Sequence, residues 1–171
     1  MYDALARDLF DPGNEHVARE VRRARERHPR ASHSEVAEAL VRCAAARCGA
    51  VGALAAAPSG WLFLLPVAVD FPFQVLALNR TALGVTSALR RPTSIAERAL
   101  AAAVSLTAAG ISTWSREKGI RLARRALFDR PPAVRAAVHA GIAAALSAAA
   151  VYAVGRAARE YCRRITPPPA S

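Results

Sequence analysis

The feature that most restricts the fold of this sequence is the spacing of its prolines, because proline-containing breaks separate long alanine-rich segments. These breaks lie at Pro12-Gly13, Pro29, Pro58-Ser59-Gly60, Pro92 and Pro131-Pro132. Proline inside a helix removes a backbone hydrogen bond and breaks or kinks the helix, so each break predicts a helix end or a helix start. No run of β-branched or aromatic residues alternates with period two, so we expect no strands. The sequence predicts an all-α fold, a single helical bundle of about five helices.

Two capping boxes fix helix starts within this pattern. Ser32 and Glu35 form the first, and Ser94 and Glu97 form the second; each pair satisfies backbone N–H groups at a helix N-terminus. Asp70 is predicted to cap a third helix, with Pro72 tolerated in its first turn. The expected helices therefore cover about 15–27, 32–57, 70–89, 94–109 and 131–164. Gly110 either ends the fourth helix or kinks it before the basic stretch 114–128.

The same pattern predicts three parts of the chain. Residues 1–30 form a basic N-terminal helical arm, residues 31–164 form the helical bundle, and residues 165–171 form a disordered proline-rich tail. Residues 48–69 are uncharged but contain Pro58, Gly60 and Pro66. Two prolines and a glycine interrupt a single straight helix here, so we expect an apolar Pro/Gly-containing connection in the middle of the bundle.

Two further uncharged windows raise the question of a membrane span. They cover 99–115 and 136–155, and a spanning helix needs roughly 20 predominantly apolar residues. The first window is short, and the second is rich in alanine, which inserts weakly compared with leucine or phenylalanine. The 136–155 segment either spans a membrane or is buried core, and we favour the core.

The charge calls for an anionic partner. The chain carries 24 basic and 13 acidic residues, a formal net charge of +11. A charge of this size attracts an anionic membrane surface or nucleic acid. The basic segments 14–30, 116–135 and 156–164 each lie beside an apolar stretch, and between them they contain only two aromatic residues that could stack on bases, Phe128 and Tyr161. This pattern favours a membrane over nucleic acid. The predicted basic surface consists of Arg19, Arg22, Arg23, Arg121, Arg124 and Arg125.

No constellation of residues points to catalysis, a metal or a cofactor. The chain lacks Gly-x-Ser-x-Gly, a phosphate loop and paired carboxylates. Cys43 and Cys48 are five residues apart, and no histidine lies one turn away, so we expect no metal site. Three cysteines are an odd number, which argues for a reducing compartment. We therefore expect a non-enzymatic, cytoplasmic protein that is peripheral to the membrane and has no cofactor.

Two groups of candidate contact residues lie near the middle of the chain. Four aromatic side chains are predicted to contact a membrane or partner: Trp61, Phe63, Phe71 and Phe73. Asp70, Gln74 and Arg80 are predicted to form a small polar cluster, since a carboxylate in an apolar stretch is costly unless it is capped or paired.

Residues 31–88 also resemble a known family. A helix ending in Gly49-Ala50-Val51-Gly52 is followed by an apolar Pro/Gly connection, Asp70, and a helix with Gln74, Leu78 and Arg80. This pattern resembles the EcsC-like proteins, and the Ala/Gly-rich final helix, with Gly141 and Gly155, is similar to their C-terminal region. The resemblance covers roughly residues 31–160. It implies an all-helical, membrane-associated protein without an established enzymatic activity.

The residues lead to three hypotheses about function. The first is a helical module that associates with a membrane surface or a membrane protein through apolar and arginine-rich faces. The second is a soluble protein-interaction module or homo-oligomeric scaffold, and the third is a nucleic-acid-binding helical protein. Membrane binding predicts that replacing Trp61 and Phe63 together abolishes partition with anionic vesicles, whereas nucleic-acid binding predicts a steep dependence on salt.

Overall fold

A computed structural model describes residues 14–56, 65–89 and 94–165. Over these ranges the chain is all-α, with five helices and no strand, which confirms the predicted fold class. The helices are α2 (Asn14–Arg27), α3 (His33–Ala55), α4 (Leu65–Ala88), α5 (Ile95–Ala126) and α6 (Pro132–Ile165). The Pro-rich tail 166–171 and the first 13 residues of the expected arm lie outside the described residues.

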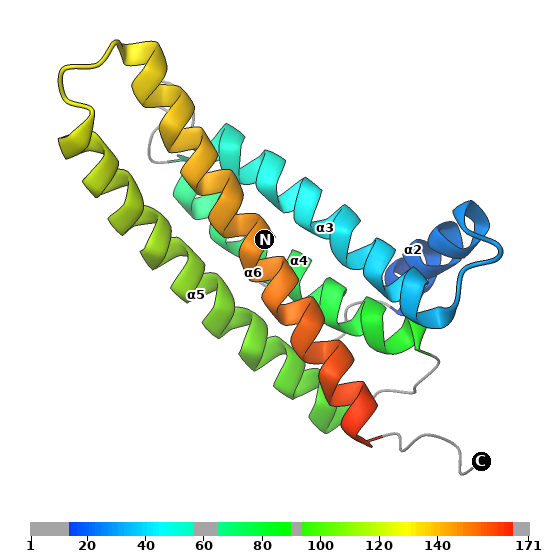
Figure 1. The fold of residues 1–171 in the computed structure, drawn as a ribbon. Coiled ribbons are helices and arrows are strands. Elements are labelled where there is room, and N and C mark those ends of the chain that lie inside the picture. Colours follow the sequence, from blue (N-terminus) through cyan, green and yellow to red (C-terminus); the bar gives the residue numbers. More distant parts are fainter. Residues whose placement is uncertain (1–13, 57–64, 90–93, 166–171) are drawn as a thin grey trace.

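The arrangement of the helices centres on α6. This helix packs against α3, α4 and α5, whereas α3 and α5 lie on opposite sides of it (Figure 1). The long helices α5 and α6 run antiparallel and are joined at one end by a short loop. At the other end of the molecule, α2 packs against α3 and α4. One long side of α5 is therefore left without a helical neighbour among the described residues.

Both predicted capping boxes are confirmed. The Ser32 hydroxyl accepts from the Glu35 N–H at 3.3 Å, and the Ser32 N–H donates to the Glu35 carboxylate at 2.7 Å. Ser94 and Glu97 repeat the arrangement at 3.2 and 2.9 Å. These reciprocal bonds satisfy N–H groups that have no partner within the helix, so the starts of α3 and α5 are determined by local sequence.

One predicted boundary is wrong, and one that the sequence left open is decided by the structure. α4 begins at Leu65, so Asp70 lies in its second turn and is not its N-cap. The helix continues back through the apolar residues before Asp70 because Pro66 falls in the first turn, where the missing N–H costs no hydrogen bond. Pro72 then lies inside the helix. α5 continues through Gly110 and Gly119 to Ala126, because no proline interrupts it and each internal glycine costs only about 1 kcal/mol.

The apolar connection is shorter than predicted. Residues 48–55 belong to α3 and residues 65–69 belong to α4. The chain that joins the two helices therefore covers only 56–64, and residues 57–64 lie outside the described residues.

The core consists of two clusters of mostly small side chains. The first joins α2 to α3 and α4, and it includes Val17 and Val21, so α2 packs on the bundle through its apolar stripe. The second cluster joins α3, α4, α5 and α6 around Leu78 and Val151, which are fully buried. Alanine removes little surface from water, so this core depends on close approach of the helix backbones.

Two glycines allow that close approach between α3 and α6. A Cβ atom on Gly52 would lie 2.6 Å from the Ser147 hydroxyl and 2.9 Å from the Ala143 carbonyl oxygen. A Cβ atom on Gly155 would lie 2.5 Å from a methyl group of Val41. All three distances are shorter than normal contacts, so these positions accept only glycine at the present helix separation.

Polar contacts join the same helices at their edges. The half-buried Arg159 of α6 pairs with Glu38 and donates to the Ser34 hydroxyl at 2.8 Å, both on α3. Arg47 of α3 pairs with Glu20 of α2 at 2.8 Å, and Arg25 of α2 donates to the Ala88 carbonyl of α4 at 3.2 Å. These bonds hold α6 against α3, and they hold α2 against α3 and α4.

Candidate functional site

The outer side of α5 is apolar along most of its length. Its exposed side chains recur at helical spacing and form one stripe: Leu100, Val104, Ile111, Trp114 and Leu122. The opposite side of α5 faces the bundle and buries Ala102, Ser105, Ala109 and Ser112. A helix that is apolar on both sides needs a second apolar environment besides its own core. This stripe is therefore the first part of a candidate contact surface.

The outer side of α6 extends this surface. Val134, Gly141, Ala145, Ala149 and Tyr152 are exposed along it, also at helical spacing. Both α5 and α6 are long and apolar enough to cross a membrane by length and composition, and only 22% of each apolar window is buried in the bundle. Among the side chains that the structure describes, twelve of the fourteen large exposed hydrophobic ones lie on α5, α6 or their connecting loop. We call this combined α5–α6 side the outer face.

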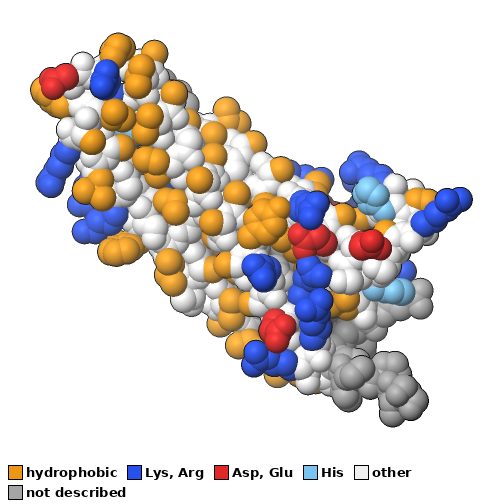
Figure 2. Space-filling view, viewed as in Figure 1, with side chains coloured by type: hydrophobic (Ala, Val, Ile, Leu, Met, Phe, Trp, Pro, Cys, Tyr) orange, Lys and Arg blue, Asp and Glu red, His pale blue; other side chains and the backbone are white. Residues whose placement is uncertain are grey.

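Charged side chains lie around the outer face and leave its middle free. In Figure 2, hydrophobic side chains run along the face, whereas charged ones gather over the C-terminal half of α6 and towards the other end of the molecule. Lys118 lies over the ring of Trp114, with its Nζ atom 5.6 Å from the ring centroid, so a cation and an aromatic ring border the apolar stripe together. Arg121, Arg124 and Arg125 are exposed on the next turns of α5.

The antiparallel register of α5 and α6 determines how wide a zone is free of charged residues on both helices at once. We call this zone the uncharged belt. The Ser112 hydroxyl donates to the Leu146 carbonyl at 3.4 Å, and the Tyr161 hydroxyl donates to Glu97 at 3.1 Å. In this register, residues 103–115 of α5 lie opposite residues 143–155 of α6, and both stretches are uncharged. At 1.5 Å per residue, the belt that is free of charge on both helices is about 20 Å wide.

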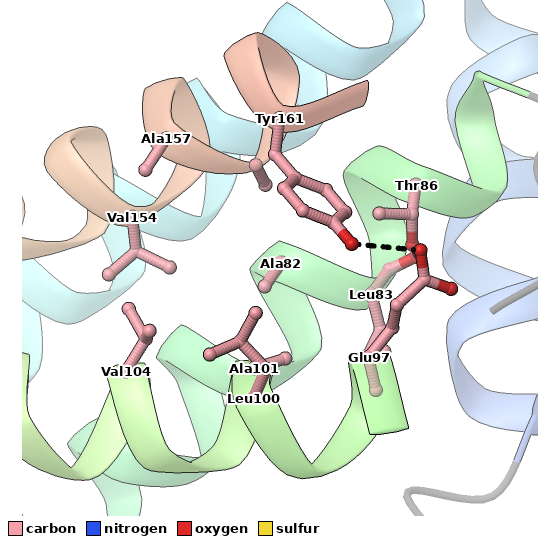
Figure 3. Close-up of a pocket in the computed structure, with 11 residues that line it drawn as sticks. Ala82, Leu83, Thr86, Glu97, Leu100, Ala101, Val104, Val154, Ala157 and Tyr161 are labelled. Carbon is pink, nitrogen blue, oxygen red and sulfur yellow. Dashed lines mark hydrogen bonds between the residues drawn. The ribbon is translucent and has the colours of Figure 1, made fainter. Parts of the chain in front are cut away.

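A groove opens between α5 and α6, with α4 beneath it (Figure 3). Its volume is about 220 Å³. The lining is almost entirely apolar and consists of Ala82, Leu83, Thr86, Glu97, Leu100, Ala101, Val104, Val154, Ala157, Ala158 and Tyr161. Leu100 and Val104 also belong to the exposed stripe of α5, so the groove is continuous with the outer face.

One polar contact crosses the end of this groove. The Tyr161 hydroxyl of α6 donates to one carboxylate oxygen of Glu97 (Figure 3). The other carboxylate oxygen accepts from the Ser94 N–H. Glu97 thus caps α5 and holds α6 against it with the same carboxylate. The rest of the lining offers packing surface rather than hydrogen-bonding partners, which suits an apolar occupant.

The structure places Arg80 apart from Gln74 in the predicted polar cluster. Gln74 is buried, and its amide donates to the Ser112 hydroxyl at 2.8 Å, while its carbonyl oxygen has no hydrogen-bond partner. Arg80 is half-buried and lies six residues further along α4, which places it on a different side of the helix from Gln74. The backbone of Asp70 lies one turn before Gln74, and its side chain is not among the described ones.

The four predicted aromatic contacts do not form one surface among the described residues. Trp61 and Phe63 lie outside the described residues. Phe71 is half-buried and packs against the second core cluster, so it contributes to the bundle interior. Phe73 is 39% exposed on α4. The exposed apolar surface is instead on α5 and α6, and the sequence pointed to it only through the two uncharged windows.

The predicted basic surface also divides into two groups. Arg19, Arg22 and Arg23 are exposed on α2, at the side of the molecule away from α5 (Figure 1). Arg121, Arg124 and Arg125 are exposed at the hairpin end of α5. Only this second group borders the outer face. The arginines of α2 therefore cannot contact the same flat surface as the apolar stripe of α5.

The described residues also bear on the predicted lack of a metal site. No three histidine, cysteine, aspartate or glutamate side chains converge within 14–56, 65–89 and 94–165. His139 is half-buried on α6, and its pKa is lowered by burial and by the nearby cations Arg124 and Arg135. Its Nε2 atom has no hydrogen-bond partner, so it resembles a packed core histidine more than a ligand.

The geometry of the site is that of an apolar face with an adjoining groove and basic ends. The resemblance to EcsC-like proteins stays a prediction from the residues. No family model, curated protein or solved structure matches this chain.

Proposed function

We propose that this protein associates with the surface of an anionic membrane through the outer face of α5 and α6. The observation that carries the proposal is the double-sided apolar character of α5. Ala102, Ser105 and Ala109 on one side are buried in the bundle, while Leu100, Ile111 and Trp114 on the other are 52–61% exposed. Water is an unfavourable environment for such a stripe, and the headgroup region of a bilayer accepts it.

The width of the uncharged belt favours surface association over a spanning hairpin. The belt shared by α5 and α6 is about 20 Å wide, whereas the hydrocarbon core of a bilayer is about 30 Å thick. A spanning hairpin would bring Lys118 or Arg156 into the apolar region, at a cost of several kcal/mol. A hairpin that lies on the surface leaves these cations at the level of the headgroups, where they attract anionic lipid.

Flotation with liposomes tests the proposal directly. The purified protein is mixed with vesicles of phosphatidylglycerol and phosphatidylcholine, or of phosphatidylcholine alone, at low and high salt. We expect the protein to float with the anionic vesicles. A fraction of the protein should still float at high salt, because salt does not screen the apolar contact. Failure to float under every condition would refute the proposed function.

Matched variants locate the contact. Replacing Ile111 and Trp114 with serine removes the centre of the outer face and should abolish salt-resistant flotation. The variant Phe73→Ser removes an exposed aromatic residue of α4 and should float like the wild type. A third variant, Trp61→Ala with Phe63→Ala, tests the segment that the sequence favoured. If only this third variant loses flotation, the contact lies at 61–63 and the assignment to the outer face is wrong.

An interaction scaffold is the second candidate function, and the same exposed stripe favours it. A partner helix or a second copy of the chain would cover the stripe equally well. This alternative predicts a stable oligomer in buffer without lipid, which sedimentation equilibrium measures. A monomer that floats with anionic vesicles refutes the scaffold and supports the membrane.

A further inference from the structure

The groove beside the outer face has the properties of a site for a single lipid chain. We propose that it takes one acyl chain of an anionic membrane phospholipid, and that the phosphate of this lipid binds Arg156 and Arg163. The inference rests on the proposed function, because the groove opens on the face that would contact the membrane. It adds a defined lipid site to what would otherwise be a general attraction to the surface.

The lining determines what kind of group fits the groove. Alanine side chains from three helices (Ala82, Ala101 and Ala157) leave a volume of about 220 Å³ between α4, α5 and α6. The polar contact between Tyr161 and Glu97 is confined to one end. A hydrocarbon chain loses no hydrogen bond on entering such a space, whereas a polar ligand would leave its own polar atoms unpaired.

The position of the groove determines where the chain comes from. Leu100 and Val104 line the groove and are also 52% and 41% exposed on the outer face. A chain in the bilayer can therefore move from the membrane into the groove without crossing a polar barrier on the α5 side. This continuity favours a membrane lipid over a soluble ligand.

The charges beside the groove determine the headgroup. Ala157 lines the groove and also lines a neighbouring hollow together with Arg156, Arg159, Glu160 and Arg163. Two of the four arginines in 156–164 are already engaged, because Arg159 pairs with Glu38 and Arg164 pairs with Glu160.

Arg156 and Arg163 are exposed, and neither forms an ion pair with a described residue. They lie two turns apart on α6, and Figure 2 shows basic side chains gathered over this half of the helix. Two free guanidinium groups in the hollow that adjoins the apolar groove at Ala157 match a lipid that carries one phosphate and a hydrocarbon chain.

Short-chain lipids test the site without a bilayer. Dioctanoyl phosphatidylglycerol is titrated into the full-length protein below its critical micelle concentration, and NMR of methyl groups follows the binding. We expect shifts at Leu83, Val104 and Val154, and weaker binding of dioctanoyl phosphatidylcholine. Shifts that avoid these groove methyls, or equal binding of the two lipids, would overturn the inference.

Two variants separate the groove from the arginines. Ala157→Leu fills the groove and should lower affinity about tenfold, because it excludes at least two methylene groups. Ala153→Leu is the matched control, since Ala153 is exposed one turn earlier on α6 and does not line the groove. Arg156→Gln with Arg163→Gln should remove the preference for the anionic lipid, at about fivefold for each arginine.

The outcomes distinguish this site from the proposed function. If Ala157→Leu binds dioctanoyl phosphatidylglycerol as tightly as Ala153→Leu does, the groove is not the site, whatever the flotation result. If the wild type binds the short-chain lipid at the groove methyls but does not float with vesicles, the site stands and the surface association fails.

Discussion

The contact between Gly155 and Val41 gives the sharpest test of the fold that supports the outer face. The change is Gly155→Ala, which adds one methyl group at a point 2.5 Å from one methyl of Val41 and 2.9 Å from the other. Val41 is 1% exposed, and both of its methyl groups face the added atom, so the side chain cannot clear the space by moving only one of them. The helices must separate or Val41 must leave its rotamer.

The magnitude follows from two opposing effects. Overpacking a well-packed core typically costs about 1–3 kcal/mol, whereas replacing a helical glycine with alanine stabilises by about 1 kcal/mol. The net expectation is a loss of about 0–2 kcal/mol. The matched control is Gly141→Ala on the same helix, where no atom lies within 4 Å of the added methyl. The control should gain about 1 kcal/mol, so the two variants should differ by about 1–3 kcal/mol.

Urea denaturation followed by circular dichroism measures both free energies of unfolding. A double-mutant cycle with Val41→Ala strengthens the test, because removing the Val41 methyls should relieve most of the clash and give a favourable coupling between the two changes. If Gly155→Ala stabilises the protein as much as Gly141→Ala does, then α3 and α6 do not approach closely in solution and the packing described above is wrong.

Three further predictions concern other contacts. Ser94→Ala removes the capping box of α5 and should lower the free energy of unfolding by about 1 kcal/mol in urea titrations, and an unchanged midpoint would argue against the cap. His139 has a lowered pKa in the folded state, so the unfolded state binds more protons and the free energy of unfolding should fall as pH drops below about 6.5. His139→Gln should therefore make the melting temperature less dependent on pH in this range. An unchanged dependence would contradict the role given to His139. Arg159→Met removes the bonds to α3, including the pair with Glu38, and should cost about 1–3 kcal/mol by thermal melts, so a neutral result would place Arg159 in solvent.

The secondary structure could be predicted where the signal is local. Both capping boxes and the break at Pro131-Pro132 depend on residues within one turn, and these boundaries are confirmed within a residue or so. The start of α4 was predicted wrongly because Asp70 is a good N-cap residue in isolation. The helix extends back to Leu65 instead, because Pro66 is compatible with a first turn.

The candidate site was harder to predict because it depends on which side of each helix faces the core. The sequence identified the uncharged windows 99–115 and 136–155 but favoured burial for them, since alanine-rich segments are typical of both cores and membrane helices. The sequence predicted contacts through the aromatic residues at 61–73, because aromatic side chains are the usual anchors at an interface. In the structure, Phe71 packs inward, and exposed residues such as Ile111 and Trp114 on α5 form the apolar stripe.

The sequence by itself determined the all-α class, the number of long helices, two helix starts and the surplus of positive charge, because each depends on composition or on residues close along the chain. Only the tertiary structure decided that α5 has no neighbour on its outer side among the described helices, that α2 and the end of α5 hold separate arginine groups, and that a groove opens between α4, α5 and α6. These properties depend on the register and close approach of helices far apart in sequence. Gly52 and Gly155 permit that approach, but a glycine in a sequence does not reveal which side chain it must admit.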